Sequence, residues 1–194
     1  MIASLVLLLA VSAAPTPFRV QLDTTRGPIV IEVVPAWAPR AAGRFRELVR
    51  RGYYDDTRFF RVVKGQWAQF GINGKPAVAR RIRRETIPDE DRGSSRRSNL
   101  RGTVAFAFDE PDSRSTQVFI SLGDNSRLDA QGFAPFGRVV LGMDVADALE
   151  SGYAETSGGG IRGGRQAPLF EEGNAYLDRN FPKLDRILRA RIRH

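Results

Sequence analysis

The sequence predicts a mainly β protein, either an antiparallel β-barrel with helical caps or a β-sandwich. Runs of about five to eight aliphatic, β-branched and aromatic residues recur along the chain and are separated by turn residues. Two short helical patterns interrupt these runs. The chain has 194 residues and 42% hydrophobic content, which is enough for one well-filled core. We therefore expect one domain over residues 18–194, and composition does not choose between barrel and sandwich.

The first segment predicts a hairpin followed by an amphipathic helix. Residues 18–24 and 28–34 have strand composition and flank a turn that contains Gly27. Pro39 suits a first helical turn, apolar residues then recur at helical spacing, and Gly52 ends the helix. The residues expected on its outer face are Arg40, Arg44, Arg46, Glu47, Arg50 and Arg51.

A second hairpin, residues 58–63 and 67–72 around a Lys64-Gly65 turn, holds two polar side chains that need an explanation. Arg61 is the charged residue inside an apolar strand, and Gln69 is the strongly polar one in the partner strand. A guanidinium is costly to bury unless it is paired, hydrogen-bonded or used. The alternative is that Arg61 points to solvent.

The remaining elements follow from the same patterns. Residues 74–101 are polar without a sustained period and predict a long loop. The glycine-dense residues 155–165 lack the order of a phosphate-binding loop and predict a flexible segment. Further strands are expected at 103–108, 117–122, 135–141 and 184–192, and short helices at 143–150 and 174–181. In the last strand, Leu188, Ala190 and Ile192 are expected to face inward, and Arg189 and Arg191 outward.

The amino terminus and the charge bear on location and partners. Residues 1–13 resemble a secretory signal that ends in small residues, so we expect an exported, periplasmic or secreted protein cleaved near Ala13, without a stable membrane span. The net charge of +8 raises nucleic acid or another polyanion as a partner. A solvated basic face is the default explanation of that charge, and we expect no nucleic-acid partner.

The residue inventory excludes several chemistries. The single histidine is His194, and cysteine is absent, so the sequence lacks the residues for a zinc site or for a Cys-His or Ser-His nucleophile. The acidic clusters at 55–56 and 89–91 lie in turn-like contexts and are expected to be solvated charges. We expect neither a metal nor a cofactor. A reaction without proton transfer, nucleophile or metal remains.

Three blocks of sequence resemble the cyclophilin family of peptidyl-prolyl isomerases, and in particular its exported bacterial members. Residues 59–71 are similar to the family's F-x-R-V-x-x-G-F-M-x-Q-x-G pattern. Residues 102–107 are similar to its G-T-x-x-M-A block, and residues 116–120 to the S-Q-F-F-I block that follows. Residues 128–129 and 136–139 are similar to its L-D and F-G-x-V blocks. The resemblance implies a closed eight-stranded antiparallel β-barrel capped by two short α-helices. It also implies isomerisation of X-Pro bonds in proline-containing peptides and in unfolded or partly folded exported proteins, by a monomer.

The resemblance also implies a site. Arg61 would be the catalytic donor to the proline nitrogen, because its guanidinium is always charged and presents a rigid fork. The residues implied to bind substrate are Phe60, Gln66, Trp67, Gln69, Ala107, Phe108, Gln117, Phe119, Leu128 and Phe133. Ordinary core packing is the alternative for Phe119 and Leu128.

The chain departs from the family pattern at five positions. The family has Phe, Met and Asn where this chain has Gln66, Trp67 and Phe108. It commonly has Trp at the position of Arg127 and often His at the position of Phe133. Gln66 puts a polar group at the proline pocket, and Phe108 removes a side-chain amide near the peptide. A catalytically weak module that binds proline peptides with the same fold is therefore the alternative function.

Overall fold

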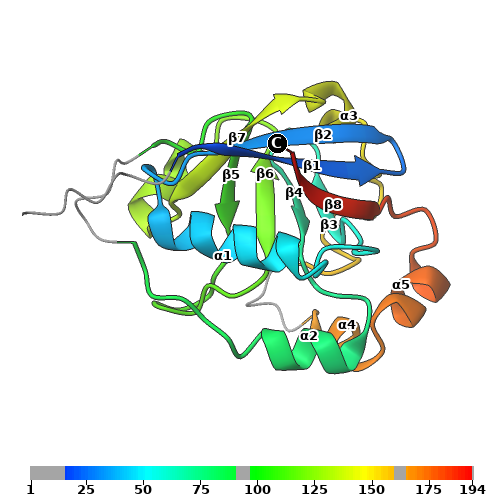
Figure 1. The fold of residues 1–194 in the computed structure, drawn as a ribbon. Coiled ribbons are helices and arrows are strands. Elements are labelled where there is room, and N and C mark those ends of the chain that lie inside the picture. The colour runs from blue at the N-terminus through cyan, green and yellow to red at the C-terminus, as the bar shows by residue number, and fades with distance from the viewer. Residues whose placement is uncertain (1–15, 91–96, 160–164, 194) are drawn as a thin grey trace, which may run out of the picture.

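The computed structural model describes residues 16–90, 97–159 and 165–193. The predicted signal segment lies outside these residues. The elements follow the order β1 (Phe18–Thr24), β2 (Gly27–Val33), α1 (Pro39–Arg50), β3 (Arg61–Val63), β4 (Trp67–Phe70), α2 (Pro76–Ile82), β5 (Thr103–Phe106), β6 (Val118–Ser121), η1 (Ser126–Gln131), β7 (Pro135–Leu141), α3 (Met143–Asp147), α4 (Ala167–Glu171), α5 (Asn174–Asn180) and β8 (Ile187–Arg193) (Figure 1).

The strands form one eight-stranded antiparallel sheet in the order β3-β4-β6-β5-β7-β2-β1-β8. The sheet curls, and an isolated antiparallel bridge between Arg58 and Arg186 joins its two ends. Beside this bridge, Phe59 N donates to Asp185 O at 2.9 Å and Ile187 N donates to Thr57 O at 2.8 Å. The predicted mainly β fold with eight antiparallel strands is confirmed.

The core lies inside the curl because each strand turns its apolar alternation inward. In β1 the buried side chains include Val20 and Leu22, and β2 opposes them with Ile31 and Ile29. Helix α1 runs along one end of the curled sheet (Figure 1) and inserts Phe45 among these residues. A fully buried side chain of this size contributes about 1.5–3 kcal/mol.

Two predictions of side-chain direction are wrong. Arg44 is buried, because its Nε donates to Ser115 O at 3.0 Å and its Nη2 to Glu85 O at 2.9 Å, which satisfies the guanidinium. Leu188 is 49% exposed. The β1–β8 register shifts between Asp23 and Thr24, and this bulge turns Leu188 away from the core.

A second, smaller core lies beside the barrel under α2, α4 and α5, which gather together in Figure 1. Its buried residues are Phe60, Ile72, Ala79, Leu169, Phe170, Leu177 and Leu184. The seven-residue helix α2 falls within the segment predicted as a loop. The barrel thus has an added helical layer next to the strand that carries Arg61.

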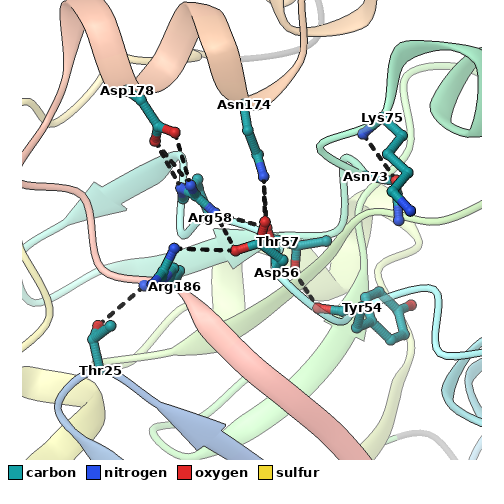
Figure 2. A network of polar contacts seen from close by, with 10 residues as sticks. All are labelled: Thr25, Tyr54, Asp56, Thr57, Arg58, Asn73, Lys75, Asn174, Asp178 and Arg186. Atoms are coloured by element: carbon teal, nitrogen blue, oxygen red, sulfur yellow. Dashed lines mark hydrogen bonds and ion pairs between the residues drawn. The ribbon is translucent and has the colours of Figure 1, made fainter.

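Ion pairs around Arg58 hold this layer to the barrel, as Figure 2 shows. The buried Arg58 donates to Asp178 of α5 at 2.8 Å and to Asp56 Oδ1 at 2.8 Å. Asp56 also pairs with Arg186 at 3.3 Å and accepts a hydrogen bond from Asn174 at 3.0 Å. The prediction that the acidic pair at 55–56 is simply solvated is therefore wrong.

Among the described residues, no helix is long and apolar enough to cross a bilayer. Within the same ranges, no cluster of three or more His, Cys, Asp or Glu side chains could hold a metal ion.

Candidate active site

The hairpin β3–β4 places Arg61 directly opposite Gln69. The predicted two-residue turn at Lys64-Gly65 would pair Arg61 with Ala68, so the loop is one residue longer than expected. Opposed residues of an antiparallel pair share one face, with Cβ atoms about 4.5–5.5 Å apart. Arg61 Nη1 donates to Gln69 Oε1 at 3.0 Å. The Arg61 side chain is 19% exposed, so it lies in contacts and does not extend into solvent.

A chain of three glutamines orients this arginine from behind. Gln69 Nε2 donates to Gln117 Oε1 at 2.8 Å, and Gln117 Nε2 donates to Gln166 Oε1 at 2.8 Å. All three amides are buried. Gln69 can direct its Oε1 toward Arg61 because its Nε2 is already committed to Gln117. Sequence reasoning found Gln69 and Gln117 but missed Gln166.

A carboxylate that sequence reasoning also missed completes the surroundings of Arg61. Glu155 Oε2 accepts from Arg61 Nε at 2.8 Å, and Glu155 Oε1 accepts from Arg61 Nη2 at 2.7 Å. Glu155 belongs to the glycine-dense segment predicted to be flexible. Its residues 155–159 are placed against β3, whereas residues 160–164 lie outside the described part of the chain.

The predicted pocket wall lies on the same face. Phe119 of β6 is the neighbour of Gln69 in the β4–β6 ladder, so Arg61, Gln69 and Phe119 form one row across three strands. The Phe119 ring is 5.7 Å from that of Phe133, which lies 4.4 Å from Phe108. The structure therefore brings these predicted residues together as an aromatic cluster.

Backbone hydrogen bonds hold the segments that flank this aromatic cluster. Ala107 N donates to Gln117 O at 2.9 Å, which places the end of β5 beside the glutamine chain. Leu128 is half-buried in η1, and its carbonyl accepts from Phe133 N at 3.3 Å. The carboxylate of Asp129 accepts from Asn99 N at 2.9 Å and thereby fixes η1.

Two charged groups near the cluster have shifted pKa values. Burial lowers the pKa of Arg114 to about 10, and this arginine, 3.8 Å from the Phe108 ring centroid, stays protonated at neutral pH beside Asp89. Asp89 is thus a pairing group and not the solvated charge expected. Partial burial raises the pKa of Asp129, but hydrogen bonds from Ser98 and Asn99 outweigh it and hold that pKa below its usual value.

Trp67 lies between two arginines. The Cζ atom of Arg61 is 4.6 Å from the indole centroid and that of Arg127 is 5.5 Å from it. Arg127 Nη2 also donates to Gln66 Oε1 at 3.2 Å. The indole N–H is buried and has no hydrogen-bond partner within the described structure. Gln66, Trp67 and Arg127, three of the five departures from the family pattern, are therefore in mutual contact.

The structure corrects the prediction that Phe60 binds substrate. Its side chain is 1% exposed and packs in the second core with Leu169 and Phe170, where no peptide reaches it. Alternation explains the difference, since adjacent residues of an extended chain point to opposite sides. The Phe60 carbonyl accepts from Ser157 Oγ at 2.7 Å, so this residue anchors the Glu155 segment.

Comparisons with known proteins agree with this geometry. The family model described as cyclophilin type peptidyl-prolyl cis-trans isomerase/CLD matches residues 19–165. A peptidyl-prolyl cis-trans isomerase of Acinetobacter baylyi is 34% identical over 147 residues, covering 72% of this chain and 75% of the relative. Isomerase B of Escherichia coli is 33% identical over 147 residues, covering 72% and 88%.

Solved structures show the same fold. A cyclophilin of Cryptosporidium parvum aligns with a TM-score of 0.65 and 20% identity over 92% of this chain and 99% of that one. A cyclophilin of Hirschia baltica aligns with a TM-score of 0.61 and 20% identity over 89% and 73%. The chain belongs to the family of cyclophilin-type peptidyl-prolyl cis-trans isomerases, which confirms the enzyme class predicted from its sequence.

Proposed function

We propose that Arg61 catalyses isomerisation of X-Pro bonds by donating a hydrogen bond to the proline nitrogen as the bond twists. Rotation breaks amide resonance against a barrier of about 18–20 kcal/mol and leaves a lone pair on that nitrogen. A donor placed there stabilises the twisted state more than the planar one. Such selectivity is what lowers a barrier.

The observation that carries this proposal is the row Arg61, Gln69 and Phe119 on one face of three adjacent strands. With strands about 4.8 Å apart, the backbones of Arg61 and Phe119 are about 10 Å apart, which leaves room between their side chains for a proline ring with its amide turned toward Arg61. Gln69 sets the direction of the fork. The pocket and the donor are thus held by strands and not by loops.

The energy required is within reach of this arrangement. A rate gain of about 10⁴-fold needs about 5.5 kcal/mol of selective stabilisation. One donor aimed at a developing charge supplies about 2.7–4 kcal/mol. Exclusion of water by Phe108, Phe119 and Phe133 and the ordered contacts of the peptide would supply the rest.

We also propose that its substrates are proline-containing segments of unfolded or partly folded exported proteins. A related cyclophilin of Cryptosporidium parvum was crystallised in the presence of the dipeptide Ala-Pro. The signal-like residues 1–13 support export. Mass spectrometry of the native protein should find a monomeric chain that begins near Ala14 in the exported fraction. An intact Met1 in a cytosolic pool would contradict this.

The second candidate function is a proline-peptide binder with little turnover. The contact that favours it is the pairing of Arg61 with Glu155, supported by the polar contact between Gln66 and Arg127 at the pocket. A protease-coupled assay with a Xaa-Pro tetrapeptide separates the two functions. The isomerase accelerates the slow phase in proportion to enzyme concentration, whereas the binder gives a calorimetric binding signal at the same concentrations without acceleration.

A further inference from the structure

We infer that Glu155 competes with the substrate for Arg61, an inference that rests on the role proposed above for Arg61. Glu155 accepts from Arg61 Nε at 2.8 Å and from Nη2 at 2.7 Å, and Gln69 accepts from Nη1 at 3.0 Å. These contacts use three of the five N–H donors of the guanidinium, one on each nitrogen, and leave one N–H on Nη1 and one on Nη2 for a peptide.

The pairing with Glu155 is unfavourable for catalysis. The acceptors of a prolyl peptide bond are neutral, whereas Glu155 is a carboxylate that binds the planar fork at two points. Charge-assisted hydrogen bonds are about twice as strong as neutral ones, so the guanidinium is drawn toward Glu155. The carboxylate also offsets the positive charge of Arg61, which weakens donation by the remaining N–H groups to the twisted peptide bond, so Glu155 raises the barrier.

The fold holds Glu155 at this place through the residues that follow it. Ser157 Oγ donates to the carbonyl of Phe60 at 2.7 Å, which fastens the segment to the residue before Arg61. Gly159 N donates to Glu155 O at 2.7 Å, closing a turn. A Cβ at Gly158 would lie 2.5 Å from Phe60 Cδ2, so the close approach needs a glycine.

The same segment also reaches the glutamine chain from the other side. Gln166 receives the hydrogen bond of Gln117, and its own Nε2 lies 3.4 Å from the carbonyl of Gly158. Glu155, Ser157 and Gly158 are thus fixed to β3 and, through Gln166, to the amides behind Arg61. The carboxylate of Glu155 is therefore part of the site.

The competition has a limited size. The Glu155 side chain is 46% exposed, and ion pairs in such a position contribute about 0.2–1 kcal/mol. Because Glu155 binds the guanidinium at two points, the upper part of this range applies, and removing the charge should raise kcat/KM by about two- to fivefold. The gain should appear mainly in kcat, because Arg61 donates to the substrate in the twisted state.

The test compares Glu155→Gln with the wild type in the protease-coupled assay, in both the native and the Arg61→Ala background. Glu172→Gln is the matched control, because Glu172 is a similarly exposed glutamate paired with Arg179 at 2.6 Å. Raising the salt concentration adds a second readout. Salt screens the Glu155 pair, so it should raise wild-type kcat and leave that of Glu155→Gln almost unchanged.

The inference predicts a two- to fivefold gain for Glu155→Gln that is absent in the Arg61→Ala background and in Glu172→Gln. An unchanged or lower kcat/KM in Glu155→Gln, with Arg61→Ala strongly impaired, overturns the inference and leaves the proposed function standing. Full activity of Arg61→Ala overturns the proposed function itself. A gain that persists without Arg61 shows that Glu155 acts elsewhere and also overturns the inference.

Discussion

Replacing Gln117 with methionine should cost both stability and turnover, because Gln117 is the middle of the glutamine chain. Methionine keeps the length of the side chain and removes its donor and its acceptor. Gln69 Nε2 then loses its acceptor at 2.8 Å and Gln166 Oε1 loses its donor at 2.8 Å. Two buried polar groups are left without these partners, and the amide that orients Arg61 is free to turn.

The magnitude follows from these two groups. Each buried group left unsatisfied costs about 1–3 kcal/mol, so Gln117→Met should lower the free energy of unfolding by at least about 2 kcal/mol. For a chain of this size, that lowers Tm by about 4–8 °C. Loss of the direction of Arg61 should reduce kcat/KM by about tenfold, which is about 1.4 kcal/mol.

A double-mutant cycle with Gln166→Met measures the coupling. Urea unfolding gives the stability of both single variants and of the pair, and the protease-coupled assay gives kcat/KM. Removing both partners leaves fewer unsatisfied groups than the two single changes together, so the losses should be less than additive by more than about 0.5 kcal/mol. Additive losses would refute the chain, as would unchanged turnover in a folded Gln117→Met variant.

Two further predictions concern the pocket and its support. Gln66→Phe should tighten binding of a proline peptide, since about 40 Å² of added apolar contact is worth about 1 kcal/mol; weaker binding by calorimetry would mean that Trp67 already fills the space. Asp129→Asn should lower Tm by about 2–4 °C at pH 7, the effect of about 1 kcal/mol in an exposed group. Because the folded pKa of Asp129 is lowered, its contribution is complete above the unfolded pKa of about 3.9 and is lost as the pH falls through the folded value, so the Tm difference should narrow as the pH falls below about 3.9. A Tm gap that stays constant as the medium is made more acidic would show that the Ser98 and Asn99 hydrogen bonds are not its source.

Alternation and turn chemistry explain why the strands and hairpins could be predicted from the sequence, whereas the barrel is implied by the family resemblance. A two-residue turn at Lys64-Gly65 would pair Arg61 with Ala68, but the loop contains the three residues 64–66, and Arg61 therefore faces Gln69. The existence of the hairpin depends on local spacing, which the sequence displays directly, whereas its register depends on the exact loop length. Gln117 and Phe119 entered through the family pattern; Phe119 lies in the neighbouring strand β6, and Gln117 directly precedes that strand.

Contacts between distant segments could not be predicted in this way. Glu155 meets Arg61 across 94 positions, from a glycine-dense stretch without a hydrophobic period. The partners of the buried Arg44 likewise come from residues far along the chain. Helix α2 has seven residues, too few for a helical period to stand out, and the bulge that exposes Leu188 has no local signature.

The measurement that tests the central claim most directly is kcat/KM of Arg61→Ala and Arg61→Lys beside Arg138→Ala, a strand arginine in the ion pair with Glu32. Arg61→Ala should lose about 10²- to 10³-fold, or about 2.7–4 kcal/mol of transition-state stabilisation, with little change in peptide affinity. Arg61→Lys should recover little, because an ammonium cannot reproduce the planar fork that Gln69 orients. Arg138→Ala should keep normal turnover. A folded Arg61→Ala variant with undiminished kcat/KM would contradict the assignment of Arg61 as the catalytic donor.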